Sequence, residues 1–311
     1  MLKSFLKKGY YFFKKRTEGQ PQRLYEIDGF ILDMGERHML SLIQKNCLMY
    51  DRFVPFLGEL ADLKLDRMKE SDRGVIIDIG ANVGDTVAGM VRHTGANVIC
   101  VEPTKKFSIL LEKNIANMGD AYAKRIRIVN AYIAQNSEEN YKSEIIGGTA
   151  IKQKITADTE KEAPTLTIPE LLSKIQILPE TLTLVKIDTD GYDSECIMSF
   201  GEQLKSISPL LFWENQIDMD EQMYKFIDMV NYLSESGYTH FFLFDNFGNY
   251  MCRIDADSMK SINRYLGRIL HKNSPRSFYY VDVLASKHED RGICETVIKR
   301  YLKDFDDKGR S

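Results

Sequence analysis

The fold is decided by residues 74–86, which have the sequence Gly74-Val75-Ile76-Ile77-Asp78-Ile79-Gly80-Ala81-Asn82-Val83-Gly84-Asp85-Thr86. The run 75–79 is apolar and rich in β-branched side chains, which predicts a buried strand. Gly80 and Gly84 then predict a tight turn before a helix that begins near Asp85. Glycine lets a ligand approach the backbone closely, and a helix start presents unpaired N–H groups. The stretch therefore predicts a small-ligand site at the end of a strand.

Two acidic residues indicate which ligand the turn holds. A dinucleotide fingerprint has glycine where this chain has Asn82, and Asp78 precedes the first glycine by two residues. A carboxylate here disfavours an anionic pyrophosphate and attracts an ammonium or sulfonium group. Glu102 follows a second apolar run, 97–101, and lies 22 residues after Gly80, near the spacing at which an acid accepts the hydroxyls of a ribose. A ribose and an amino-acid cation together suggest S-adenosylmethionine.

Further motifs accompany the glycine turn along the chain: Tyr50-Asp51-Arg52, Val101-Glu102-Pro103, Leu184-Val185-Lys186-Ile187-Asp188-Thr189-Asp190-Gly191-Tyr192-Asp193, Leu211-Phe212-Trp213-Glu214-Asn215 and Phe244-Asp245-Asn246-Phe247-Gly248. With Ile77-Asp78-Ile79-Gly80-Ala81-Asn82-Val83-Gly84-Asp85-Thr86, they make the chain resemble a known family, the FkbM-type S-adenosylmethionine-dependent methyltransferases, over roughly residues 45 to 285. The resemblance implies a class I methyltransferase fold, which is α/β and Rossmann-like: about seven mostly parallel strands with helices on both faces and an antiparallel edge hairpin. It also implies methyl transfer to oxygen, often to a hydroxyl of a sugar or polyketide.

We expect the cofactor to lie across the carboxyl ends of the parallel strands, where open α/β sheets form their ligand crevice. Asp78 and the glycine turn should hold its methionine part, and Glu102 its ribose. The end of the third strand, at Asn130-Ala131, should meet the adenine edge. The expected cofactor-binding residues are Asp78, Gly80, Ala81, Asn82, Gly84, Asp85, Thr86, Glu102, Pro103, Asn130, Ala131 and Asp188.

The expected catalytic residues are carboxylates at the same sheet edge. Asp188 and Asp190 follow the predicted strand 183–187, and Glu214 follows the strand 209–213. A carboxylate at this place can orient an acceptor hydroxyl and take its proton, with Asp188 or Asp190 first and Glu214 second. Asp193 is expected instead to cap the next helix. The family usually has Glu at position 190, and the shorter Asp190 changes the reach of that acid. The spacing shows no third ligand beside Asp188 and Asp190, so we expect no metal.

The remaining chain divides into segments by charge and periodicity. Residues 1–17 form a basic amphipathic segment, 18–73 an N-terminal helical subdomain, 74–290 the methyltransferase domain and 291–311 a helical and polar tail. Residues 1–16 carry six positive charges and no acid, a pattern typical of a helix on an anionic membrane surface. A solvated tail or a helix docked on a partner subunit is the alternative. Residues 134–165 predict a long excursion with a hairpin or mobile flap over the pocket. An exposed irregular hairpin without function is the alternative.

Composition limits the functional classes. A net charge of −3 argues against a general nucleic-acid binder, and five scattered cysteines without a C-x-x-C pair indicate reduced thiols in a cytosolic protein.

The expected acceptor is a glycan, carried on a lipid at the inner membrane face. N-methyl transfer usually shows an Asn/Asp-Pro-Pro-aromatic run where this chain has Asp188-Thr189-Asp190-Gly191, which favours oxygen. The alternatives are an N-methyltransferase, a small-molecule O-methyltransferase, an NAD-type oxidoreductase and a catalytically inactive adenosyl-binding module. The sequence does not indicate the oligomeric state.

Overall fold

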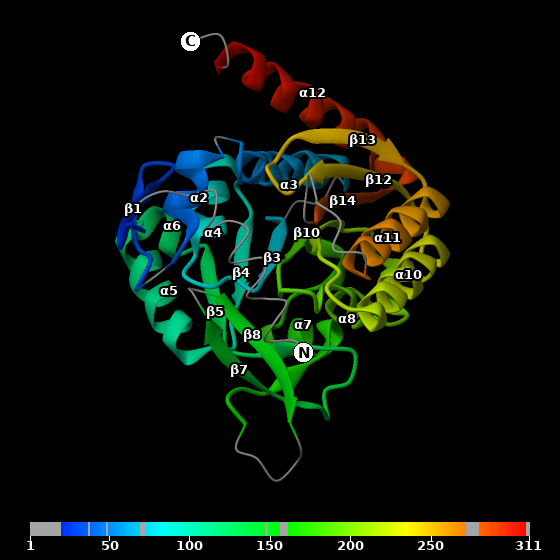
Figure 1. The fold of residues 1–311 in the computed structure, drawn as a ribbon. Helices are drawn as coiled ribbons and strands as arrows, with labels where there is room; N and C mark the ends of the chain where they lie inside the picture. The colour runs from blue at the N-terminus through cyan, green and yellow to red at the C-terminus, as the bar shows by residue number, and fades with distance from the viewer. Residues whose placement is uncertain are drawn as a thin grey trace.

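The fold is organised around one eight-stranded sheet with the order β13-β12-β14-β11-β10-β3-β4-β5 (Figure 1). The computed structural model describes residues 20–36, 38–47, 49–68, 73–146, 149–155, 161–271 and 280–308; the basic segment 1–17 lies outside these ranges. Strands β5, β4, β3, β10 and β11 are parallel neighbours, and β14 runs antiparallel to both β11 and β12. This arrangement confirms the class I methyltransferase fold. The strands span Val75–Ile79 (β3), Asn97–Val101 (β4), Ile126–Val129 (β5), Leu182–Ile187 (β10), Leu210–Asn215 (β11), Tyr238–Asp245 (β12), Tyr250–Ile254 (β13) and Val281–Lys287 (β14).

The central strands are buried on both faces because their successive side chains belong to two different cores. In β3, Val75, Ile77 and Ile79 pack into one hydrophobic cluster, whereas Ile76 packs into the other. This is why the parallel strands are nearly continuous apolar runs without a polar alternation. Asp78 interrupts the run, and it is completely buried. A buried acid in a central strand requires a specific partner, which the site description below identifies.

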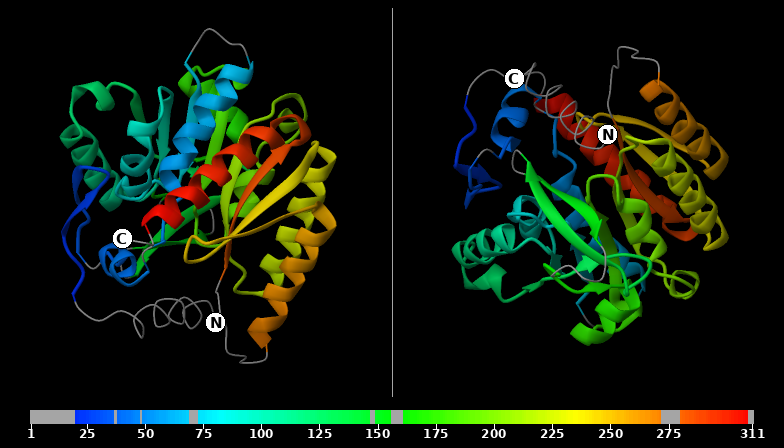
Figure 2. Two further views of the ribbon diagram at one scale, coloured as in Figure 1. Left: turned by 90° about the horizontal axis from the view of Figure 1, so that it is seen from above. Right: turned by 60° about the horizontal axis from the view of Figure 1, so that its bottom comes forward.

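Helices cover both faces of the sheet, as Figure 2 shows. On one face, α3, α4, α5 and α12 contribute side chains to the core that contains Ile76; on the other, α7, α8, α10 and α11 contribute to the core that contains Ile77. The helices span Leu40–Asn46 (α2), Val54–Met68 (α3), Asp85–Met90 (α4), Lys105–Asn117 (α5), Asp120–Ala123 (α6), Ile168–Ile175 (α7), Asp193–Met198 (α8), Gln203–Ser206 (α9), Asp220–Glu235 (α10), Ala256–His271 (α11) and Arg291–Lys308 (α12). Thr167 begins α7 with a capping box to Glu170, as its sequence predicts.

Two parts of the fold differ from the sequence-based expectation. The sheet has eight strands where about seven were expected, because β13 adds an edge strand beside β12. Its residues are mostly exposed, so the strand lacks the buried alternation that would have marked it. The stretch expected to be loop and helix before residue 40 contains a two-stranded hairpin, Leu24–Ile27 (β1) and Phe30–Asp33 (β2). Each of these strands has only four residues, too few for a clear period.

A second hairpin forms in the segment that was expected to fold over the pocket. Strands Asn140–Ile146 (β7) and Thr149–Ile155 (β8) pair antiparallel, and Tyr132–Ile133 (β6) pairs with Thr165–Leu166 (β9) beneath them. The hairpin projects from the carboxyl end of the sheet (Figure 1). The expected hairpin is therefore confirmed, and its position brings it to the ligand crevice.

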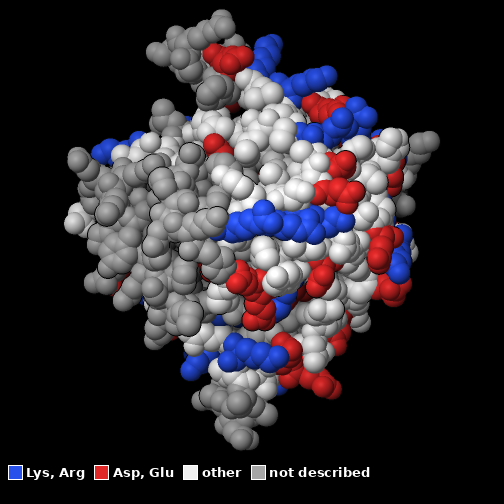
Figure 3. Space-filling view, turned by 45° about the vertical axis from the view of Figure 1, so that its right-hand side comes forward, with Lys and Arg blue, Asp and Glu red and all other residues white. Residues whose placement is uncertain are grey.

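The surface carries charges of both signs. On the face shown in Figure 3, Lys and Arg side chains lie among Asp and Glu side chains. Among the described residues, no helix combines the length and the apolar character needed to cross a membrane.

Candidate functional site

The predicted turn after β3 brings the ends of two neighbouring strands into contact. A Cβ on Gly80 would lie 1.9 Å from the backbone oxygen of Asp188, and Gly80 has a φ of +81°, so only glycine fits there. Asp188 N–H in turn donates to Ile79 O at 3.0 Å. The turn amides differ from the expectation, because Gly80 N and Ala81 N donate to Val101 O instead of facing a ligand. Gly80 therefore serves first to join the two strand ends.

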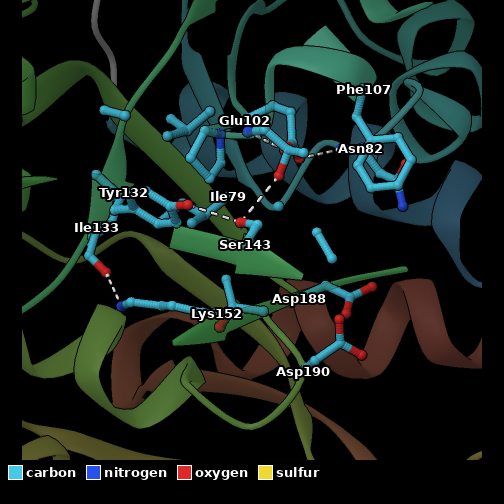
Figure 4. A pocket seen from close by; sticks show the side chains of 17 residues that line it. Ile79, Asn82, Glu102, Phe107, Tyr132, Ile133, Ser143, Lys152, Asp188 and Asp190 are labelled. Atoms are coloured by element: carbon cyan, nitrogen blue, oxygen red, sulfur yellow. Dashed lines mark hydrogen bonds between the residues drawn. The ribbon is translucent and has the colours of Figure 1, made fainter. Parts of the chain in front are cut away.

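A cavity with about 540 Å³ of empty space lies at this strand edge (Figure 4). Residues after β3, β4 and β10 form one side, and the β7–β8 hairpin forms another. The lining residues are Ile79, Gly80, Asn82, Val101, Glu102, Pro103, Thr104, Phe107, Ala131, Tyr132, Ile133, Ser143, Ala150, Lys152, Asp188, Thr189 and Asp190.

Glu102, the acid expected to bind a ribose, is fixed at the cavity wall by two backbone amides. Its carboxylate accepts Thr104 N–H at 2.8 Å and Asn82 N–H at 3.0 Å, and the side chain is only 3% exposed. Burial raises the pKa of Glu102 to about 7, although the hydrogen bonds from the two backbone amides act in the opposite direction and lower it. Carboxylate oxygens can accept further hydrogen bonds, so Glu102 retains acceptor capacity for a ribose hydroxyl. The geometry fits a ribose at this wall.

The end of β5 contributes to the cavity differently from the expectation. Ala131 lines it, but the Asn130 side chain is exposed and donates to Ser108 Oγ and to Glu102 O. The neighbouring Tyr132 lines the cavity. Phe107, from α5, also lines the cavity and offers an apolar ring.

Several residues expected to hold the methionine part of the cofactor do not line the cavity. Asp78 is completely buried and does not line the cavity; its Oδ1 lies 3.2 Å from Lys186 Nζ. Gly84, Asp85 and Thr86 form the start of α4 and also lie outside the cavity lining. Asp85 still contributes to the field at the site, because its charge helps to raise the pKa of Lys186.

Asp188 and Asp190 line the cavity together, and Figure 4 shows their carboxyl groups side by side. Glu214 lies outside the cavity lining but faces the same two acids, since burial and then the charges of Asp188 and Asp190 raise the pKa of Glu214 well above its ordinary value. Burial and Asp188 likewise raise the pKa of Asp190. Asp282, in β14, is the register partner of Glu214, and burial raises its pKa as well. We call the set Asp188, Asp190, Glu214 and Asp282 the acidic wall.

Asp193 does not cap the following helix, so that expectation is wrong. Tyr192 occupies the N-cap position of α8 without a side-chain cap, and Asp193 Oδ2 accepts from Thr189 Oγ1 at 3.0 Å. The Asp193 carboxyl group thereby stabilises the loop after β10.

Two tyrosines from distant parts of the chain lie near the acidic wall. Tyr280 OH donates to Tyr50 OH at 3.4 Å, and the charge of Glu214 contributes to raising the pKa of both phenols.

Several cavity residues were not expected from the sequence. Ser143, Ala150 and Lys152 come from the hairpin, and Thr104 and Tyr132 flank expected positions. The only sequence signal for the first three was the predicted flap itself. Within the described ranges, no group of three or more His, Cys, Asp and Glu side chains is arranged to hold a metal ion.

Comparison with known proteins gives one informative match. The model of a family described as the methyltransferase FkbM domain matches residues 78–239, just over half of the chain. This range includes the Gly80 turn, Glu102, the hairpin and the start of the acidic wall. No curated protein matches the chain.

Three solved structures illustrate the likeness in fold. Precorrin-6y C5,15-methyltransferase from Geobacter metallireducens GS-15 is 12% identical, with 73% of this chain and 87% of that chain covered and a TM-score of 0.35. The plantazolicin methyltransferase BpumL in complex with SAH is 7% identical, with 80% and 89% covered and a TM-score of 0.39. A SAM-dependent O-methyltransferase from Thermotoga maritima is 12% identical, with 74% and 64% covered and a TM-score of 0.36.

Proposed function

Because the chain belongs to the FkbM methyltransferase family and uses S-adenosylmethionine as its methyl donor, we propose that it methylates a hydroxyl group of a sugar in a cell-surface glycan or glycolipid precursor. One observation carries this proposal: Asp188 and Asp190 line the same cavity as Gly80 and Glu102. Carboxyl groups beside the cofactor cavity suit an acceptor that is rich in hydroxyl donors, because ionised carboxylates are pure hydrogen-bond acceptors.

The acidic wall divides into groups with different roles. Asp188 Oδ2 lies 3.4 Å from Lys186 Nζ, so the Asp188 carboxylate forms an ion pair with this ammonium group. Burial and neighbouring acids raise the pKa of Asp190 and of Glu214. A protonated carboxyl group can donate one hydrogen bond as well as accept. Asp188 is therefore the proton acceptor of the proposal, and Asp190 orients the sugar.

The proposed reaction is a direct displacement. S-adenosylmethionine supplies an electrophilic methyl group on its sulfonium sulfur. The acceptor oxygen forms a bond to the methyl carbon as the carbon–sulfur bond breaks, and its proton passes to the Asp188 carboxylate. The chain contributes mainly alignment of the hydroxyl with the methyl carbon, which can supply a large part of the acceleration.

The test uses S-adenosylmethionine labelled with ¹³C in its methyl group and a panel of sugars, glycolipids and amines. The proposal predicts a labelled methoxy group on a sugar, with turnover lowered about 10²- to 10⁴-fold in Asp188→Asn, as expected when a general base is lost. Asp228→Asn, on an exposed face of α10, is the matched control and should keep full turnover. Label on nitrogen, or full activity of Asp188→Asn on a sugar, would overturn the assignment.

We further propose that the protein is cytoplasmic and contacts the inner membrane face through residues 1–16, where six positive charges stand without an acid. The full-length protein should sediment with anionic vesicles at low salt and should be released as salt rises. Replacing Lys7 and Lys8 by Glu should weaken this binding, and neutral vesicles are the control. Equal binding to both kinds of vesicle, or none to either, would refute the membrane contact.

A further inference from the structure

Three hydroxyl groups meet where the β7–β8 hairpin closes the cavity. Thr104 Oγ1 donates to Ser143 Oγ at 3.2 Å, and Tyr132 OH lies 2.8 Å from the same Ser143 oxygen. Tyr132 OH also donates to Glu162 Oε2 at 2.8 Å. All three hydroxyl residues line the cavity next to Glu102 (Figure 4). They are hydroxyl groups on the cavity wall beside Glu102, where the ribose is expected to bind.

The direction of each hydrogen bond in this cluster follows from the Glu162 carboxylate. A hydroxyl group has one proton to donate and two lone pairs to accept with. Tyr132 gives its single proton to Glu162, so in the contact between Tyr132 and Ser143 the serine must be the donor. Ser143 thus uses its proton on Tyr132 and one lone pair on Thr104. It retains one lone pair and no proton.

In this arrangement the cluster can accept a hydrogen bond from a ligand, and Ser143 can donate one only by giving up its hydrogen bond to Tyr132. The Glu162 carboxylate is held in this arrangement because the same Oε2 atom also accepts Ser143 N–H at 2.8 Å. Asn130 does not line the cavity, and its side-chain Nδ2 donates to Ser108 Oγ and to Glu102 O. The wall beyond Glu102 thus selects for a ligand with an N–H group.

We propose that Ser143 of the hairpin accepts a hydrogen bond from the 6-amino group of the cofactor's adenine, and that this contact makes the enzyme discriminate against a purine with an oxo group at the same position. An oxo group would place its lone pairs against the remaining lone pair of Ser143. The inference depends on the cofactor and not on the acceptor, so it holds whichever group is methylated.

Lys152 keeps the hairpin in the position that this contact requires. Its Nζ donates to Ile133 O at 3.1 Å, lies 3.7 Å from Glu195 Oε2 and sits 3.9 Å from the centre of the Tyr141 ring. Figure 4 shows the ammonium group turned toward Ile133 and away from Asp188 and Asp190. Lys152 is thus a positioning residue that ties β8 to β6 and α8.

The test measures binding by isothermal titration with S-adenosylhomocysteine and its deaminated analogue, S-inosylhomocysteine. The wild-type protein should prefer the adenosyl compound by about tenfold or more, the scale expected when a buried acceptor loses its donor. Ser143→Ala should weaken binding of the adenosyl compound several-fold and reduce the preference to near unity. Lys142→Ala changes the neighbouring exposed residue on the same strand and should behave as wild type.

A second variant tests the direction of the hydrogen bonds. Tyr132→Phe removes the acceptor of the Ser143 proton, so Ser143 becomes free to donate, and the inosyl compound should bind more tightly than it binds to wild type. An unchanged preference in Ser143→Ala, or equal binding of both compounds by wild type, would overturn the inference. Failure to find a methylated sugar would refute the proposed acceptor but leave these binding ratios unaffected. No binding of either compound would overturn the cofactor site and this inference with it.

Discussion

Lys186 and Asp78 are register partners in the parallel strands β10 and β3, and Lys186 Nζ lies 3.2 Å from Asp78 Oδ1. Both side chains are buried. Burial raises the pKa of Asp78, and the charge of Lys186 opposes that rise. Burial alone would lower the pKa of Lys186, but Asp78, Asp188 and Asp85 raise it above its ordinary value. Lys186 thus connects the acid inside the sheet with the acidic wall.

Removing the cation of this pair should be costly. Lys186→Met leaves Asp78 buried without its partner, so we expect a loss of about 3–5 kcal/mol in the free energy of unfolding, measured with urea. The double variant Lys186→Met/Asp78→Leu should recover much of this loss, because no buried charge remains. Lys174→Met, on the exposed face of α7, is the control. If the double variant were as unstable as Lys186→Met alone, the ion pair would not explain the loss.

The contact between the two strand ends gives a second prediction. Gly80→Ala would place a Cβ 1.9 Å from Asp188 O at a φ of +81°, so the backbone of one strand end must move. We expect destabilisation by about 2 kcal/mol or more, together with weaker binding of S-adenosylhomocysteine. Gly95→Ala is the control, because a Cβ there meets nothing within 4 Å. Equal stability of the two variants would contradict the close approach.

Glu102 predicts how cofactor binding depends on pH. The ribose hydroxyls donate to the ionised carboxylate, and burial raises the pKa of Glu102 to about 7. Affinity for S-adenosylhomocysteine should therefore rise with pH up to about 7 and level off above it. Well below pH 7, the affinity should change by at most about tenfold per pH unit. Titrations between pH 5.5 and 8.5 measure this. Glu102→Gln should bind weakly and without this slope, and a wild-type affinity that is flat across the range would refute the role.

The same pKa has an opposite consequence for the ligand-free protein. Because folding raises the pKa of Glu102 from its ordinary 4.5 to about 7, the folded state binds the proton more tightly. The resulting contribution to stability is fully present below about pH 4.5 and is lost as pH rises through 7. Asp193, with a pKa raised to about 7, acts in the same direction. The difference between wild type and Glu102→Gln in urea unfolding isolates the part due to Glu102, and no pH-dependent difference would contradict it.

The central elements of the fold could be predicted from sequence because each combines a strong apolar run with a clear stop. The strands 75–79 and 97–101 were predicted with their observed bounds; Gly80 follows the first and Glu102-Pro103 follows the second. Strand β13 and the β1–β2 hairpin were not, because their residues are exposed or too few to show a period.

The cavity was predicted where its residues follow predicted strands. Gly80, Asn82, Glu102, Ala131, Asp188 and Asp190 all line it, because the carboxyl ends of parallel strands meet at one edge. Ser143 and Lys152 could not be placed from sequence, since their position depends on how the hairpin folds back over that edge. The burial of Asp78 was not foreseen either, because its partner Lys186 is 108 residues away and meets it only through strand register.

The measurement that tests the account most directly is titration of the purified protein with S-adenosylmethionine, S-adenosylhomocysteine and NAD, comparing wild type with Glu102→Ala. Glu112→Ala, exposed on α5, controls for a general effect of losing an acid, and thermal melting checks that each variant is folded. The account predicts that both adenosyl compounds bind wild type and the control, that folded Glu102→Ala loses this binding, and that NAD does not bind. Preference for NAD, or undiminished adenosyl binding by Glu102→Ala, would contradict it.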